Sequence, residues 1–295
     1  MEDAVLARPE IEIINGLSAL AHDIDVVLCD IWGVLHNGVK GYEAASHALT
    51  RFRQGGGRVI LVSNAPRPNI DIVPILDRFG ISRSAWDGIV TSGDIARDIL
   101  VRSNWKKFFW LGPERDQSLF DRLPLDTSPL EQADVIVCTG LFNDITETPE
   151  TYREMLETAL ALNKVMLCAN PDLVVERGGE LIYCAGAIAA LYEQMGGRTC
   201  YSGKPHVDIY QAAVSVVASL NGKNTDRSRI LLIGDAIRTD IAGAVAFGCP
   251  SLFVLRGIHM HELGLSESAF DNGTFMKFMA DAAFRPRFAI DSLSW

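Results

Sequence analysis

Several polar residues that end apolar runs in this sequence are of types that could together bind a metal ion and a phosphate. They are Asp30, Ser63, Asn64, Lys204, Asp235 and Asp240. Carboxylates that converge repel one another unless a divalent cation lies between them, and hard oxygen ligands with open water positions suit Mg²⁺. A lysine and a hydroxyl nearby would bind phosphate oxygens, and a carboxylate can attack phosphorus to form an aspartyl phosphate. These residue types therefore predict phosphoryl transfer beside a metal ion.

Strands that alternate with helices must bring these residues together. The predicted buried strands span residues 26–29, 58–62, 89–91, 229–233 and 250–255. The predicted helices span residues 44–54, 70–79, 207–220 and 240–247, and Ser92 is expected to cap a further helix that reaches residue 101. This alternation predicts an α/β fold with a doubly wound parallel sheet. The carboxyl ends of its strands lie at one edge, where such sheets build their sites.

The same pattern starts again near residue 103 and indicates a second unit. Its predicted strands span residues 107–111, 133–138 and 165–169, and its predicted helices span residues 117–123, 148–162 and 185–195. We interpret residues 104–197 as a smaller α/β unit inserted into a core domain formed by residues 1–103 and 198–295. The core is also predicted to carry helices over residues 9–22 and 272–283 and a last edge strand over residues 288–290.

The composition argues against several classes of protein. A chain of 295 residues can form two domains with full cores. Its net charge of -10 argues against nucleic-acid binding, which needs basic surface to neutralise phosphates. No apolar run approaches the roughly 20 residues of a membrane span, the six cysteines lack metal-binding spacing, and the N-terminus has no apolar signal segment. We therefore expect a cytoplasmic protein that binds neither membranes nor nucleic acids.

The order of the polar segments resembles the motifs of the haloacid dehalogenase (HAD) superfamily of phosphohydrolases. The four matching segments are residues 30–35 (DIWGVL), Ser63-Asn64, residues 203–205 (GKP) and residues 234–243 (GDAIRTDIAG). The last has the form found in class IIA, the group of the NagD-like sugar phosphatases and the pyridoxal phosphate and phosphoglycolate phosphatases. Residues 91–93, 168–172 and 185–187 resemble that group's landmarks around its cap. The resemblance covers nearly the whole chain and implies a Rossmann-like core whose inserted unit is a cap domain.

The resemblance also implies a nucleophile and a Mg²⁺ site. Asp30 corresponds to the nucleophile, which is also a Mg²⁺ ligand. The main-chain oxygen of Trp32 corresponds to a second ligand and Asp235 to a third. Asp240 corresponds to a residue that supports the metal from nearby or binds it directly. In such a site the aspartate attacks phosphorus, and water then releases phosphate from the aspartyl phosphate.

Substrate-binding residues follow from the same resemblance. Lys204 would bridge the phosphoryl group and the nucleophile, while Ser63 and Asn64 would hold phosphate or the substrate near it. Glu176 and Arg177, in a cap loop, are candidates for substrate specificity. Because a cap closes over the site, the expected partner is a small phosphorylated metabolite, such as a sugar phosphate, a nucleotide or a pyridoxal phosphate-like ester. Caps of this group often form dimer contacts, so a homodimer is also expected.

Trp32 departs from the family pattern and leaves two functions open. The family's hydrolases usually have an aspartate here, which protonates the leaving oxygen and later activates water. Indole offers only a non-acidic N–H donor, and loss of a general acid–base typically costs roughly 10²–10⁴ in rate. The first hypothesis is a Mg²⁺-dependent phosphatase of low activity. The alternative is a catalytically weak or inactive HAD-like protein that binds a phosphorylated metabolite.

A few other residues have chemistry that the motifs do not use. His36 lies six positions after Asp30 and could carry protons, but we interpret it as a loop residue without a catalytic role. Arg67 is expected either to reach a phosphate or to form a surface salt bridge. His259 and His261 would not share a helix face, so we expect them at the surface rather than on a metal.

Overall fold

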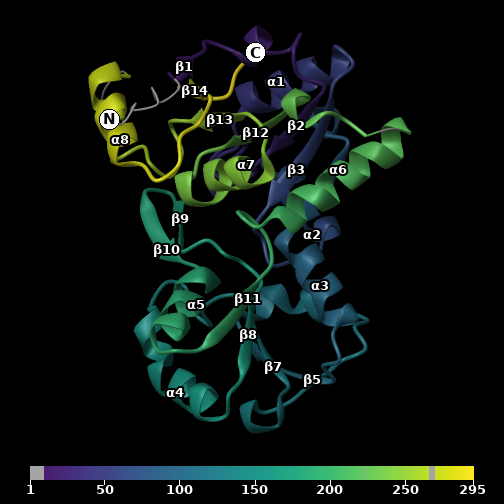
Figure 1. The fold of residues 1–295 in the computed structure, drawn as a ribbon, viewed down its shortest axis with the longest axis vertical. Helices are drawn as coiled ribbons and strands as arrows, with labels where there is room; N and C mark the ends of the chain where they lie inside the picture. Colours follow the sequence, from purple (N-terminus) through teal and green to yellow (C-terminus); the bar gives the residue numbers. More distant parts are fainter. Residues whose placement is uncertain (1–9, 223, 266–269) are drawn as a thin grey trace, which may run out of the picture.

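The computed structural model describes residues 10–222, 224–265 and 270–295, which form two lobes (Figure 1). The upper lobe of the view contains a seven-stranded sheet and the lower lobe a five-stranded sheet. Every strand pairing in both sheets is parallel. The predicted α/β fold with parallel sheets is therefore confirmed. Among the residues in these ranges, no helix is long and apolar enough to cross a membrane.

The larger sheet places its most apolar strands at its centre. Its order is β1 (Glu12–Ile13), β14 (Phe288–Ile290), β13 (Ser251–Val254), β12 (Ile230–Gly234), β2 (Val26–Cys29), β3 (Arg58–Ser63) and β4 (Gly88–Thr91). Val27 and its neighbours on one face pack against α1 (Glu43–Gln54) and α2 (Asn69–Arg78). Leu28 and its neighbours on the other face pack against α6 (Val207–Asn221) and α7 (Ala242–Phe247). Since helices cover both faces, the central strands β2, β3 and β12 are apolar at most positions.

The smaller sheet continues past the end predicted for the inserted unit. Its order is β11 (Arg198–Tyr201), β8 (Val165–Cys168), β7 (Val135–Cys138), β5 (Lys107–Leu111) and β6 (Asp126–Thr127). β11 pairs with β8, although we placed residue 198 and its successors in the core. As an edge strand with a partly exposed surface, β11 lacks the apolar run that identified the other strands. The helices α4 (Arg153–Ala161) and α5 (Ala185–Gln194) cover one face of this sheet.

One helix and one hairpin link the two lobes. Helix α3 (Ser92–Arg102) places Ile95 in the core of the larger lobe, and Ala96 and Leu100 in the core of the smaller one. An antiparallel hairpin of β9 (Val174–Arg177) and β10 (Glu180–Tyr183) lies between the lobes (Figure 1). Its turn, Gly178-Gly179, has positive φ at both residues, as tight hairpin turns of this length require. This pair of glycines was the sequence signal for a hairpin that we did not predict.

The two ends of the core correct the predictions made there. The helix expected over residues 9–22 is wrong in its described part, where Glu12–Ile13 forms β1 and Leu17–Ala19 forms a 3-10 turn. Because β1 pairs outside β14, the strand at 288–290 is not the edge strand. Its backbone groups are satisfied by pairing on both sides. Helix α8 (Asn272–Asp281) confirms the last predicted helix.

Two predicted helix starts also need correction. Thr91 rather than Ser92 caps α3, because its side chain accepts a hydrogen bond from the Asp94 N–H (2.9 Å) and Asp94 accepts one in return from the Thr91 N–H (3.0 Å). The helix expected from residue 240 begins with a π-helical turn, Ile237–Ile241, before α7. Such turns are frequent at functional sites.

Candidate active site

The carboxyl ends of three neighbouring strands bring the predicted site residues together. Asp30 follows β2, Ser63 and Asn64 end β3, and Asp235 follows β12. The sheet order β12–β2–β3 places these ends side by side. The backbone N–H of Asp30 donates to the carbonyl of Ile233 at 2.8 Å, which continues the pairing of β2 with β12 up to the predicted nucleophile.

Lys204 lies between two carboxylates at this edge. Its Nζ is 2.6 Å from Oδ1 of Asp30 and 2.7 Å from Oδ1 of Asp240. All three residues are buried. Burial raises the pKa of Asp30, Lys204 opposes that rise, and the carboxylates of Asp240 and Asp235 add to it, so the pKa of Asp30 stands well above its ordinary value. Burial lowers the pKa of Lys204, but the same two partners reverse this effect and hold the pKa well above its ordinary value. The lysine therefore stays charged beside the candidate nucleophile.

The residues predicted to bind Mg²⁺ form a cluster that fits a hard divalent cation. Asp30, Asp235 and Asp240 each place one carboxylate oxygen within 4.8 Å of the others. Lys204 alone does not balance three buried carboxylates, and burial together with Asp240 raises the pKa of Asp235 to about 7. Backbone packs tightly against this group: Gly33 has φ +85°, and a β-carbon there would collide with the Asp235 carboxylate. The buried, oxygen-only donor set therefore suits Mg²⁺ chemically.

Asp240 differs from the other two carboxylates of the cluster in its hydrogen bonds. One of its oxygens lies against Lys204 Nζ, and the other accepts the Ala236 N–H at 3.1 Å. Asp235 uses one oxygen to accept the Ile258 N–H at 2.7 Å. With both oxygens already engaged, Asp240 is better suited to positioning Lys204 and supporting a metal than to direct coordination.

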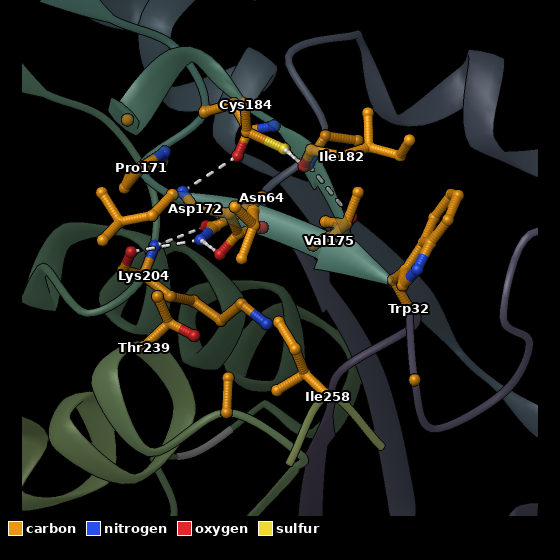
Figure 2. A pocket seen from close by; sticks show the side chains of 18 of the residues that line it. Trp32, Asn64, Pro171, Asp172, Val175, Ile182, Cys184, Lys204, Thr239 and Ile258 are labelled. Atoms are coloured by element: carbon orange, nitrogen blue, oxygen red, sulfur yellow. Dashed lines mark hydrogen bonds between the residues drawn. The ribbon is translucent and has the colours of Figure 1, made fainter. Parts of the chain in front are cut away.

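Asn64 connects the phosphate-binding segments rather than offering its amide to the cavity. Its side-chain oxygen accepts the Lys204 N–H at 2.7 Å. Its amide nitrogen donates to Asp172 at 2.9 Å and to the Lys204 carbonyl at 3.2 Å (Figure 2). The hydroxyl oxygen of Ser63 accepts the Ala65 N–H at 3.1 Å, and Ser63 lines the cavity. The amide protons of Asn64 are therefore already donated. The hydroxyl proton of Ser63 has no acceptor among these contacts, so Ser63 is the better placed of these two predicted phosphate ligands to donate a hydrogen bond.

Trp32 turns its side chain toward the hairpin. Its indole N–H donates to the carbonyl of Glu176 in β9 at 2.7 Å. Figure 2 shows the ring beside the end of that strand, near Val175. The ring of His36 meets the indole edge-on, with 5.1 Å between ring centroids, and stacks on Phe79 at 4.4 Å. The residue at the usual acid–base position therefore joins the two lobes.

His36 is held as a neutral packing residue. It is 2% exposed, and its Nδ1 accepts the Gly38 N–H at 3.1 Å. Burial lowers its pKa to about 4. These contacts agree with our interpretation that His36 has no catalytic role.

Charged residues of the smaller lobe face the same space. Arg115 and Arg177 both approach one oxygen of Asp144, at 2.7 and 3.2 Å. Arg67 reaches across from the larger lobe to the buried Asp116 at 2.6 Å, so the expectation of a surface salt bridge is wrong in its location. Because Asp116 belongs to the smaller lobe, this ion pair is a contact between the lobes.

Both lobes line a cavity of about 620 Å³, and every site residue predicted from the sequence lies in its wall. These are Asp30, Trp32, Ser63, Asn64, Glu176, Arg177, Lys204, Asp235 and Asp240. His259 also lines it, and its Nε2 accepts the Ile237 N–H at 3.3 Å, whereas His261 is exposed as predicted. The sequence reasoning missed Asp144 and Arg115, which follow no motif, and Asp172, which lies in a segment we had noted only as a landmark.

Two family models match two segments of the chain, separated by residues 126–200 of the smaller lobe. Residues 27–125 match the model described as haloacid dehalogenase-like hydrolase, and residues 201–294 match the model described as HAD-hydrolase-like. A solved structure, a hydrolase of the haloacid dehalogenase-like family from Brucella suis 1330, is 40% identical, covers 95% of this chain and 100% of that one, and has a TM-score of 0.85. The chain belongs to the haloacid dehalogenase-like family.

Relatives with named activities indicate to which group within the superfamily this HAD-like hydrolase is similar. The 5'-nucleotidase YutF of Bacillus subtilis is 24% identical over 90% of this chain and 95% of its own length. The ribonucleotide monophosphatase NagD of Escherichia coli K12 is 26% identical over 79% of this chain and 88% of its own length. These comparisons confirm the prediction of a NagD-like member of the superfamily and of a HAD-type phosphatase.

Proposed function

We propose that this HAD-like hydrolase is a Mg²⁺-dependent phosphatase that cleaves a small phosphomonoester through an aspartyl phosphate on Asp30. The observation that carries the proposal is the placement of a buried, charged Lys204 between Asp30 and Asp240 at the base of a cavity. A cation in that position neutralises charge on the transferred phosphoryl group. The relatives named for action on nucleotides support a small phosphorylated substrate.

The residues proposed to hold Mg²⁺ are Asp30, the main-chain oxygen of Trp32 and Asp235, with Asp240 in support. The bound ion would draw charge from the phosphoryl oxygens and hold the phosphate against the nucleophile. Asp240 and Ala236 fix the local geometry through the hydrogen bond between them.

The chemical steps follow from the contacts of Asp30. An oxygen of Asp30 attacks phosphorus and the bond to the leaving oxygen breaks, while Lys204 and the Ser63 hydroxyl donate to the phosphoryl oxygens. Water then attacks the same phosphorus, and Asp30 leaves as a carboxylate. Asn64 acts through its hydrogen bonds to Lys204 and Asp172, which position the lysine segment against the cap.

Arg177 is proposed to bind the part of the substrate that is remote from the phosphate. It shares Asp144 with Arg115, and two guanidinium groups on one carboxylate leave net positive charge at the cavity wall. Glu176 contributes its carbonyl to Trp32, so its proposed role in specificity is to hold the hairpin that carries Arg177. A cavity of about 620 Å³ fits a metabolite-sized ligand. The homodimer and the cytoplasmic location remain predictions.

The second candidate function, a weak or inactive protein that binds a phosphorylated metabolite, is favoured by one observation. The indole of Trp32 cannot transfer a proton, and its N–H is already bonded to Glu176. With tryptophan at position 32 the usual proton carrier is absent, while the residues proposed to bind phosphate and metal are all present.

Hydrolysis of 4-nitrophenyl phosphate separates the two functions. We expect Mg²⁺-dependent release of nitrophenol by the unaltered chain and by Asp77→Asn, whose carboxylate pairs with Arg83 on the surface. We expect none from Asp30→Asn. If the unaltered chain with Mg²⁺ releases no nitrophenol yet binds vanadate or tungstate, the binding protein is the correct description.

A further inference from the structure

We propose that Trp32 has replaced proton transfer by cap closure, and that this hydrolase therefore acts on phosphoryl groups attached to weakly basic oxygens. Acyl, enol and aryl phosphates belong to this class, because their leaving oxygens depart as anions without first gaining a proton. The inference rests on the proposed function and specifies its substrate.

The contacts around Trp32 define the closed arrangement. Its N–H bonds to Glu176, which lies 144 positions away in the chain and in the other lobe. A β-carbon on Gly38 would lie 2.6 Å from the outer ring carbons of the indole. A β-carbon on Gly178, in the hairpin turn, would lie 3.3 Å from Cγ2 of Val39. The loop that follows Asp30 and the turn of the hairpin therefore pack directly against each other, with the indole hydrogen bond at one end of the contact.

The other groups that could replace the missing acid are engaged elsewhere. His36 lines the cavity, but its buried ring packs against both the indole and Phe79, and its Nδ1 accepts the Gly38 N–H. Asp172 lines the cavity from the cap side, but its carboxylate accepts the Asn64 amide proton. Burial raises the pKa of Asp172, Lys204 and the hydrogen bond from Asn64 oppose that rise and Asp240 adds to it, so the pKa stands above its ordinary value. Because Oδ1 already accepts the Asn64 amide proton, we infer that Asp172 positions Asn64 rather than protonating a leaving oxygen, and Asp172→Asn tests this assignment.

The two steps balance without a proton carrier only for such leaving groups. In the first step, Asp30 forms a bond to phosphorus and the leaving oxygen takes the electron pair of the broken bond as a carboxylate, enolate or phenolate. In the second step, water bonds to phosphorus, Asp30 regains its electron pair as a carboxylate, and the proton of the water passes to the released phosphate. Because no side chain at position 32 activates that water, the second step is slow and phospho-Asp30 accumulates.

A series of leaving groups tests the first consequence. Single-turnover rates would be measured for acetyl, 4-nitrophenyl, phenyl and ethyl phosphate with Mg²⁺. We expect the rate to fall by more than about 10²-fold from the nitrophenyl to the ethyl ester, since a general acid contributes roughly 10²–10⁴ to the rate. Because phospho-Asp30 accumulates, we also expect a burst of nitrophenol, equal in amount to the enzyme, before steady turnover. Asp172→Asn should leave this ratio unchanged. In Trp32→Asp the ratio should shrink and the burst should disappear.

A second variant tests the hydrogen bond from Trp32 to Glu176, which we call the latch, without altering proton transfer. Trp32→Phe keeps an aromatic ring at this position but removes the N–H donor together with part of the indole that packs against Gly38, so we expect faster amide hydrogen exchange in β9 and β10, a changed KM, and an unchanged ratio between the nitrophenyl and ethyl esters. Unchanged exchange in the hairpin would overturn the latch. Comparable single-turnover rates for the two esters in the unaltered chain would overturn the substrate class, and loss of ethyl ester cleavage in Asp172→Asn would name that residue as the acid instead. Absence of any phosphoryl transfer from all four esters would contradict the proposed function itself.

Discussion

The ammonium group of Lys204 lies 2.6 Å from Oδ1 of Asp30, and both side chains are buried. The lysine belongs to the segment after the last strand of the smaller sheet, whereas the aspartate ends a central strand of the larger one. Asn64, which follows the neighbouring strand β3, ties the lysine segment to the larger sheet by accepting the Lys204 N–H. The candidate nucleophile therefore meets its electrostatic partner where the chain returns from the cap to the core.

Replacing Lys204 by methionine should lower kcat/KM for 4-nitrophenyl phosphate by roughly 10²–10³, the usual cost of losing one preorganised charge-stabilising donor. The methionine has a similar length but cannot neutralise Asp30 or the phosphoryl oxygens. Steady-state kinetics of the variant would be compared with those of Lys277→Met, which changes an exposed lysine of α8. Equal activity in Lys204→Met and the control would remove Lys204 from the mechanism.

Binding of Mg²⁺ should strengthen as the pH rises toward neutrality. Burial and Asp240 raise the pKa of Asp235 to about 7 in the metal-free protein, so a proton and the metal compete for this carboxylate below that pH. The dissociation constant should fall by about tenfold per pH unit below pH 7 and level off above it, since one proton is displaced. Titration calorimetry in buffers of different ionisation enthalpy would report the released proton. Affinity that does not change between pH 6 and pH 8 contradicts this assignment.

Replacing Asn64 by alanine should weaken both the fold and the reaction. The change leaves the buried Lys204 N–H without an acceptor and removes the donor to Asp172. An unsatisfied buried group costs about 1–3 kcal/mol, so the free energy of unfolding should fall by that amount. Urea denaturation would measure it, with Asn221→Ala as a control at an exposed position. A variant that keeps its stability and its kcat would show that these hydrogen bonds have no such role.

Arg115 and Arg177 should discriminate between substrates rather than catalyse. Changing both to methionine removes the positive charge around Asp144 at the cavity wall. We expect KM to rise roughly 10- to 100-fold for phosphomonoesters that carry a second anionic group, in line with about 1.5–3 kcal/mol for a charge-assisted hydrogen bond. The KM for 4-nitrophenyl phosphate should stay within a few-fold. Arg102→Met, at an exposed residue of α3, serves as the control. A uniform change for both kinds of ester would indicate a structural role instead.

The parts of the fold and site that depend on local patterns could be predicted from the sequence. Buried central strands are apolar at most positions, so β2, β3 and β12 and the polar residues that end them were found. Elements that pair only at an edge carry no such pattern, which is why β1 and β11 were missed. The hairpin of β9 and β10 is half-exposed and short.

Contacts between the lobes could not be predicted because they join residues far apart in the chain. Nothing near Trp32 in the sequence points to the carbonyl of Glu176, and nothing near Arg67 points to Asp116. The hydrogen bonds of Asn64 could not be predicted for the same reason, since its partners are Asp172 in the smaller lobe and Lys204 in the segment that leads back to the larger lobe. The departure at Trp32 can be read from the sequence, whereas its hydrogen bond to Glu176 is seen only in the fold.

Phosphorylation of Asp30 tests the central proposal most directly. The protein would be mixed with Mg²⁺ and 4-nitrophenyl phosphate, quenched in acid within seconds, digested, and examined by mass spectrometry for added phosphate on the peptide that contains residues 26–35. The account predicts one phosphoryl group on Asp30 in the unaltered chain and none in Asp30→Asn. Steady release of nitrophenol with no phosphate on Asp30, or with the phosphate on another residue, would contradict it.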